Sequence, residues 1–316
     1  MTELQLSLRT FPPSCPRGLW LPLVTPFRNG ELDDASLRRL VRHYAALPVD
    51  GLVLAATTGE GLTLEADETE RLVCTVRDGI GGASDIPVCL GLSGSNTSAL
   101  LATLERTAAW PIDFYLISCP YYSRPSQHGI ELHFTALADR AAHPVMIYNI
   151  PYRTGVNLGN EAMLRLANHR NIVGLKDCCA DRNQSRELLR RRPKEFAVLT
   201  GEDAHFHEAL LDGADGGIVA AAHIETASFA EVARLMAAGE RDAALAQWLE
   251  VAELARLLFA EPSPAPIKHW LWRLGLIDSA QVRLPMTEVS AELAARLDQE
   301  IERRTVGRPE LDHLSL

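Results

Sequence analysis

Lysine is scarce in this chain. Only three of its 31 basic residues are lysine, namely Lys176, Lys194 and Lys268, and the other 28 are arginine. The 41 acidic residues bring the net charge to −10, and the basic residues do not form a block. Because nucleic acids and anionic membrane surfaces are recognised by concentrated positive charge, we expect neither as a partner.

Disulfide, zinc and membrane signals are also missing. The six cysteines, at positions 15, 74, 89, 119, 178 and 179, include no C-x-x-C pair, which favours reduced thiols and a cytoplasmic location. No apolar run reaches 18 residues, and the first 18 residues lack the charged start and apolar stretch of a signal peptide. We therefore expect a cytoplasmic protein without a membrane span.

What the sequence does contain is a regular alternation of two patterns. Eight short apolar runs, each typical of a buried strand, occupy residues 19–24, 51–56, 88–92, 114–119, 145–149, 172–176, 197–201 and 217–222. Helical patterns lie between them at 36–47, 65–80, 96–109, 128–141, 161–168, 184–191 and 204–211. Strands that alternate with helices predict parallel pairing, and eight such units predict an α/β fold of the (β/α)8 TIM barrel type. No G-x-G-x-x-G motif follows the first run, which disfavours an open dinucleotide-binding sheet.

The pattern changes after residue 222, where only helices are predicted, at 229–238, 241–260, 266–274 and 287–303. The sequence thus predicts four parts. They are an N-terminal arm at 1–17, the (β/α)8 barrel at 18–225, a C-terminal helical extension at 226–305 and a loose tail at 306–316.

One lysine stands at the end of a strand that is too apolar for a surface. Residues 172–177 read Ile-Val-Gly-Leu-Lys-Asp, so Lys176 lies at the mouth of a buried core. A desolvated lysine loses its proton more readily, and the neutral amine is a nucleophile toward carbonyl groups. From the strand alone, a side chain that reaches out to solvent is an equally good interpretation.

Polar residues follow several of the runs, and in a barrel the loops after the strands share one rim. Thr57 and Thr58 offer hydroxyls and backbone N–H groups that suit a carboxylate. Tyr148, on the strand beside Lys176, is placed to transfer protons, and Arg153 is suited to grip a second carboxylate. Each residue alone has an ordinary structural explanation, such as a helix cap, but their convergence on one rim favours a function.

Other polar groups are interpreted as structural. His205 and His207 resemble a metal pair, but no further histidine or cysteine completes it, so we read a helix start and no metal site. Glu60, Glu202 and Asp203 are interpreted as caps and loop anchors rather than as an acid–base set.

Several motifs resemble the dihydrodipicolinate synthase / N-acetylneuraminate lyase family. They are T-T-G-E at 57–60, P-Y-Y-S-R-P-S at 120–126, Y-N-I-P-Y-R-T-G at 148–155, G-L-K-D at 174–177, E-P-S-P at 261–264 and R-L-P-M at 283–286. Their order and spacing fit from about residue 18 to 303. The resemblance implies a pyruvate-dependent class I aldolase-type lyase that needs no cofactor.

The resemblance also implies roles for individual residues. Lys176 would form the Schiff base with pyruvate, and Tyr148 would donate and accept the proton. Thr57 and Tyr122 would complete a proton relay, Tyr122 from a neighbouring subunit. Thr58 and Ile218 would hold pyruvate, and Arg153 would bind the carboxylate of aspartate semialdehyde. The assembly implied is a homotetramer, a dimer of dimers.

The R-T-G turn and the paired tyrosines favour condensation of pyruvate with aspartate semialdehyde to 4-hydroxy-tetrahydrodipicolinate, which leads to diaminopimelate and lysine. Departures from the family pattern occur at 91–97, Asp177–Ala180, His223 and Ser263. These departures leave open a second interpretation, an aldolase or dehydratase that acts on a 2-keto-3-deoxy sugar acid or a hydroxy-oxo-acid. A non-catalytic barrel that binds a keto acid is a weaker alternative. Ala66 and Thr69 replace histidines that help to bind lysine in some members, so we expect weak or no inhibition by lysine.

Overall fold

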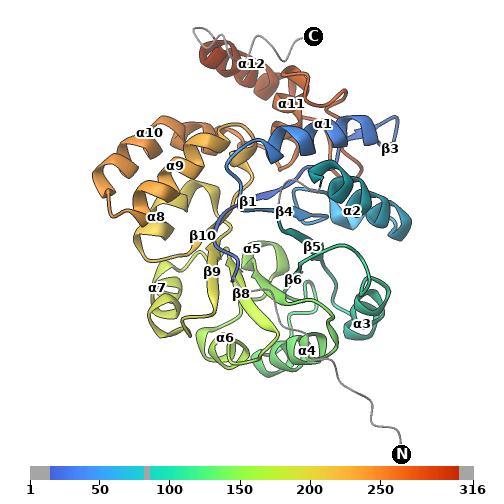
Figure 1. Cartoon of the computed structure of the whole chain (residues 1–316), viewed down its shortest axis with the longest axis vertical. Helices are drawn as coiled ribbons and strands as arrows, with labels where there is room; N and C mark the ends of the chain where they lie inside the picture. The colour runs from blue at the N-terminus through green and yellow to red at the C-terminus, as the bar shows by residue number, and fades with distance from the viewer. Residues whose placement is uncertain (1–14, 82–85, 306–316) are drawn as a thin grey trace, which may run out of the picture.

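Eight parallel strands close into a barrel in the computed structural model, which describes residues 15–81 and 86–305 (Figure 1). The strands are β1 (Gly18–Pro22), β4 (Gly51–Leu54), β5 (Val88–Leu92), β6 (Phe114–Ser118), β7 (Val145–Asn149), β8 (Ile172–Asp177), β9 (Ala197–Thr200) and β10 (Gly216–Ile218). Each strand pairs with the next, and β1 pairs with β10 to close the ring. The predicted (β/α)8 barrel is confirmed.

The barrel has an inner and an outer apolar core, because successive side chains of a strand point to opposite faces. The inner cluster includes Trp20 of β1, Val53 of β4, Met146 and Tyr148 of β7, and Ile218 of β10. The outer and larger cluster fills the space between the strands and the surrounding helices. Both faces of every strand are therefore buried, which explains why the strands read as continuous apolar runs.

Helices follow the strands around the barrel. They are α1 (Asp34–Ala45), α2 (Ala66–Ile80), α3 (Thr97–Arg106), α4 (Gln127–Arg140), α6 (Asn160–Leu166), α7 (Arg182–Arg191), α8 (Phe206–Leu211) and α9 (Thr226–Ala237). Side chains of Asp33, Asn96, Ser126 and Asp181 accept hydrogen bonds from first-turn N–H groups of α1, α3, α4 and α7. These caps satisfy donors that a helix leaves free, so they fix where each helix begins.

Short elements were not predicted from the sequence. They are the hairpin of β2 (Phe27–Arg28) and β3 (Glu31–Leu32), the single turn α5 (Pro151–Thr154), and the 3-10 turns η1 (Gly61–Thr63), η2 (Asp203–His205) and η3 (Ala221–His223). The eighth strand, predicted to run to residue 222, ends at Ile218 because the chain then turns into η3. Such elements depend on tertiary contacts more than on periodicity.

Helices α10 (Arg241–Leu257), α11 (Ala265–Arg273) and α12 (Ala291–Thr305) complete the chain, with α11 and α12 packed together beyond one side of the barrel (Figure 1). The last helix begins at 291 rather than at the predicted 287, because Ser290 accepts a hydrogen bond from the N–H of Leu293 and binds Glu261. No helix among the described residues is long and apolar enough to cross a membrane.

The domain limits stay predictions. The first helix after the proposed boundary, α9, contacts β1 as well as α10, so it packs on the barrel. Residues 1–14 of the predicted arm and the predicted tail at 306–316 lie outside the described residues.

Barrel closure depends on a glycine pair, which gives a stability test. Gly18 and Gly216 face each other where β1 meets β10, both with positive φ, and a Cβ on Gly216 would overlap the backbone of Gly18. We expect Gly216→Ala to lower the free energy of unfolding by at least about 2 kcal/mol, because both the overlap and the backbone angle are unfavourable. Urea denaturation would measure the loss.

Gly129→Ala is the matched control for that measurement. Gly129 lies in α4, and the nearest atoms to an added Cβ are at 3.5 Å, an ordinary contact. Its stability should stay unchanged or rise by up to about 1 kcal/mol. Equal stabilities of the two variants would contradict the closure argument.

Candidate active site

Lys176 lies inside the barrel, near the carboxyl end of β8. It is in register with Tyr148 on the neighbouring strand β7, and residues in register share a face of the sheet. Its Nζ atom lies 4.4 Å from the centroid of the Tyr148 ring, and only 5% of the residue is exposed. The side chain therefore does not reach out to solvent.

The surroundings of Lys176 favour its neutral form. Burial lowers the pKa of the amine below its ordinary value, and the nearby Cys178, Asp203 and Glu202 offset this only in part. Burial also raises the pKa of Asp203 to about 7, so this neighbour carries less negative charge than an exposed aspartate would. A neutral amine in such a site is able to attack a carbonyl group.

The hydroxyl of Tyr148 has two neighbours, from the segments that follow β4 and β8. It forms a hydrogen bond with the side chain of Thr57, and the Sγ atom of Cys178 lies 4.0 Å away. Burial raises the pKa of the phenol well above its ordinary value, so Tyr148 keeps its proton near neutral pH. Tyr148 thus holds a proton beside the Lys176 amine.

Gly201 provides the space that Lys176 occupies. It follows β9, and a Cβ at this position would lie 2.5 Å from Cε of Lys176 and closer still to Sγ of Cys178. Cys178, which is 1% exposed, and Gly201 were not predicted as site residues. Gly201 follows the seventh apolar run, but its contact with Lys176 depends on the pairing of β8 with β9.

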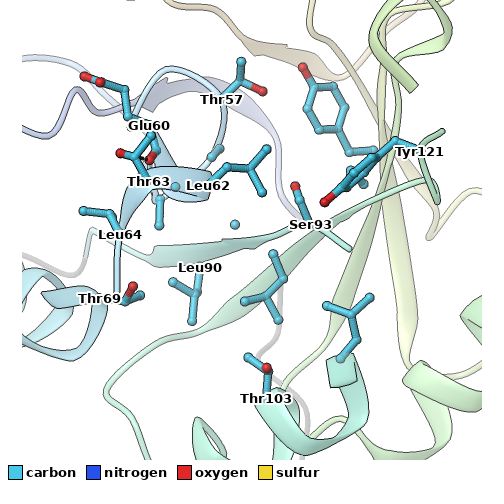
Figure 2. A pocket seen from close by; sticks show the side chains of 18 of the residues that line it. Thr57, Glu60, Leu62, Thr63, Leu64, Thr69, Leu90, Ser93, Thr103 and Tyr121 are labelled. Atoms are coloured by element: carbon cyan, nitrogen blue, oxygen red, sulfur yellow. Dashed lines mark hydrogen bonds between the residues drawn. The ribbon is translucent and has the colours of Figure 1, made fainter. Parts of the chain in front are cut away.

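A cavity of about 460 Å³ opens beside Tyr148. Thr57, Tyr148 and Arg153 all line it, so the structure brings these three predicted residues to one space. Figure 2 shows Thr57, Ser93 and Tyr121 around it, together with Leu62, Leu64, Leu90 and Thr103. The wall therefore combines hydroxyl groups with apolar side chains.

The other four predicted residues do not line this cavity, and Lys176 is one of them, although the Tyr148 ring beside it does. Thr58 and Ile218 are buried, the latter within the inner barrel core. Tyr122 is 94% exposed and has a φ of 67°, and its backbone N–H donates to the carbonyl of Thr154 at 3.1 Å. Within one chain, Tyr122 therefore points away from the site, and its neighbour Tyr121 lines the cavity instead.

The departures from the family pattern have different surroundings. Ser93 and Ser263 line the cavity, and the hydroxyl of Ser263 is buried without a hydrogen-bond partner among the described residues. His223 does not line the cavity: its Nε2 accepts from the N–H of Val24 at 3.2 Å, and its Nδ1 donates to the carbonyl of Ala220 at 2.7 Å. Burial lowers its pKa to about 4, so His223 is a neutral, structural histidine.

Ala66 and Thr69 line the far part of the cavity, where they add no charge. The expected weak or absent inhibition by lysine stays a prediction. No group of three or more histidine, cysteine, aspartate or glutamate side chains within the described ranges is arranged to hold a metal ion.

Comparison with known proteins identifies the family. The model of the dihydrodipicolinate synthetase family matches residues 15–304. The chain belongs to this family. A 4-hydroxy-tetrahydrodipicolinate synthase 2 from Clostridium acetobutylicum is 40% identical over 89% of this chain and 98% of its own length.

Solved structures of family members superpose closely on this barrel. Dihydrodipicolinate synthase from Aquifex aeolicus has a TM-score of 0.87 and 30% identity, covering 92% of this chain and 98% of its own. A chloride-inhibited dihydrodipicolinate synthase from Acinetobacter baumannii, complexed with pyruvate, has a TM-score of 0.86 and 31% identity, with coverages of 90% and 98%. The family membership thus extends over the barrel and the C-terminal helices together.

Gly201→Ala tests whether the space beside Lys176 matters. The added methyl group would displace Cε of Lys176, because it would lie 2.5 Å from that atom. We expect the variant to fold but to lose at least about 90% of the adduct that pyruvate and borohydride form at Lys176, since a misplaced amine reacts poorly. Mass spectrometry of the intact protein and of its peptides would measure the adduct.

Gly129→Ala again serves as the control, and its adduct yield should equal that of the wild type. A Gly201→Ala variant with a full adduct yield would contradict the steric argument. Thermal denaturation of both variants separates the loss of the adduct from a loss of folding.

Proposed function

We propose that this protein is a Schiff-base-forming lyase that condenses pyruvate with aspartate semialdehyde to 4-hydroxy-tetrahydrodipicolinate. The observation that carries the proposal is the buried Lys176 amine beside the Tyr148 ring, in a member of this family. The name of the Clostridium acetobutylicum relative and the pyruvate complex of the Acinetobacter baumannii relative support the same reaction.

The first half of the reaction uses pyruvate alone. The neutral amine of Lys176 attacks the keto carbon of pyruvate, and loss of water gives the protonated imine. This imine accepts the electron pair when the methyl group loses a proton, so the enamine forms without a metal or a cofactor. Tyr148, hydrogen-bonded to Thr57, moves the protons of these steps, and Thr58 and Ile218 hold pyruvate.

The second half adds the aldehyde. The enamine carbon attacks the aldehyde carbon of the semialdehyde, which forms a C–C bond and a hydroxyl group. The amino group of the semialdehyde then attacks the imine carbon, closes the ring and releases Lys176. Arg153, which lines the cavity, binds the carboxylate of the semialdehyde as a charge-assisted pair.

The site of one chain is completed by a second copy. Tyr122 is 94% exposed in a left-handed conformation, which is costly for a bulky residue unless a contact requires it. We place this side chain in the cavity of a neighbouring subunit, where it continues the proton relay from Thr57. The assembly we propose is a homotetramer built from two such dimers.

Turnover with both substrates tests the reaction. We expect pyruvate consumption, coupled to reduction of the product, to require aspartate semialdehyde. Lys176→Ala should lower kcat/KM at least about a thousandfold, since the nucleophile is lost.

Tyr148→Phe should lower kcat by roughly 10² to 10⁴ while the borohydride adduct at Lys176 still forms. If the adduct forms in the wild-type protein but turnover does not depend on the semialdehyde, aspartate semialdehyde is not the second substrate. A sugar acid or a hydroxy-oxo-acid would then be favoured as the substrate.

Mixing two inactive variants tests the shared site. Tyr122→Phe lacks the exposed hydroxyl, and Lys176→Ala lacks the amine, so each alone should have little activity. In a mixed dimer, the Tyr122→Phe chain keeps its lysine and receives an intact tyrosine from its partner. We expect co-refolded mixtures to regain up to about a quarter of wild-type activity, since only one site in a mixed dimer is complete. Mixtures no more active than their components would contradict the exchange.

A further inference from the structure

A buried ion pair joins the C-terminal helices to the loop that carries Thr57 and Thr58. Lys268 of α11 and Glu60 both have almost no exposed side-chain area, 0% and 2%. Nζ of Lys268 donates to Oε1 of Glu60 and to the carbonyl of Gln281, the latter at 2.8 Å. Oε2 of Glu60 accepts from the backbone N–H of Arg283 at 2.8 Å. Both carboxylate oxygens are thus held by the C-terminal part of the chain.

The side chain of Arg283 extends this anchor. It donates to the carbonyl of Thr63 at 2.9 Å and pairs with Glu68 in the first turn of α2. Its guanidinium carbon and Nζ of Lys268 lie 4.2 and 4.3 Å from the centroid of the Phe27 ring. We call Phe27, Glu60, Glu68, Lys268 and Arg283 the loop anchor.

The loop that it holds, residues 55–63, has a conformation that its own sequence does not favour. Ala55 and Glu60 both have a φ of 52°, in the left-handed region that few non-glycine residues adopt. A Cβ on Gly59 would lie 2.9 Å from the carbonyl oxygen of Leu23, so the loop also packs tightly on the barrel. Such backbone persists only where surrounding contacts over-determine it.

The loop connects the anchor to the reacting groups. The N–H of Glu60 donates to the carbonyl of Thr57 at 3.1 Å, and the Thr57 side chain bonds to Tyr148. In Figure 2 the carboxylate of Glu60 points away from the side on which Thr57 lies, and its contacts are with Lys268 and Arg283. A displacement of Glu60 would therefore move the hydroxyl that orients the proton donor.

We propose that Lys268 and Glu60 are positioning residues, through which the C-terminal extension fixes Thr57 against Tyr148. A buried ion pair is often no more stabilising than apolar residues of the same size. We therefore expect this pair to fix the position of the loop more than it raises the stability of the protein. The proposal rests on the proposed function only for the steps that involve pyruvate alone, because Thr57 and Tyr148 act before the aldehyde binds.

The test uses deuterium exchange into the methyl group of pyruvate, followed by NMR in D₂O. Exchange needs only imine and enamine formation, so it does not depend on the second substrate. The variants are Glu60→Gln, Lys268→Met and the double variant that carries both changes. We expect the exchange rate constant to fall at least tenfold in all three, measured well below the melting temperature of each, while the borohydride adduct at Lys176 still forms.

The double variant separates positioning from stability. It leaves no unpaired buried charge, so its melting temperature should recover most of what Lys268→Met loses. Its exchange rate should stay low, because the loop is still not held. If the melting temperature and the exchange rate of the double variant both returned to wild-type values, the proposal would be overturned. Removal of the unpaired buried charge would then be enough to restore exchange.

Arg304→Met is the matched control. Arg304 of α12 forms a largely buried pair with Glu225, and none of its hydrogen-bond partners among the described residues belongs to residues 55–63. Its loss should lower the melting temperature and leave the exchange rate within about twofold of wild type. An equal loss of exchange in this control would also overturn the proposal. A wild-type protein without exchange would instead contradict the proposed function itself.

Discussion

The burial of one amine inside a closed barrel is the constraint on which the rest of this structure depends. An ammonium group loses most of its hydration there, so the neutral form of Lys176 gains relative to the charged one. The same burial keeps Tyr148 protonated. A single physical effect thus has opposite consequences for the two neighbours, because it makes the amine lose its proton more readily and the phenol less readily.

Keeping these groups in place requires irregular backbone around a regular sheet. Gly201 leaves room for the lysine stem, Tyr122 adopts a left-handed conformation, and residues 55–63 fold into a tight, strained loop. Each irregular segment follows a barrel strand, at the rim where loops are free to vary. The strands provide rigidity, and the loops provide positions that no regular element offers.

The C-terminal helices have a part in this arrangement as well as in packing. Their contact with the barrel includes Lys268, whose side chain is wholly buried and whose partner, Glu60, belongs to the catalytic rim. Two of the three lysines in a chain that otherwise uses arginine are therefore buried in contact with the site or with its support. A compact ammonium group fits such enclosed places, where the larger guanidinium would need more partners.

The sequence by itself determined the barrel, the strand that carries Lys176 and the set of residues at one rim. Apolar runs at a regular interval specify buried parallel strands, and strand ends specify the rim, so these features follow from local pattern. Glu60 anchors its loop, as the sequence predicts, because its two carboxylate oxygens accept hydrogen bonds from Lys268 and Arg283.

Only the tertiary structure decided which residues meet. Strand register sets Lys176 beside Tyr148, and the pairing of β8 with β9 brings Gly201 to the same lysine. The exposure of Tyr122, the neutral role of His223 and the pairing of Lys268 with Glu60 across more than 200 residues have no local signal. Periodicity reports which face of an element is buried, but partners distant in sequence are fixed only when the chain packs.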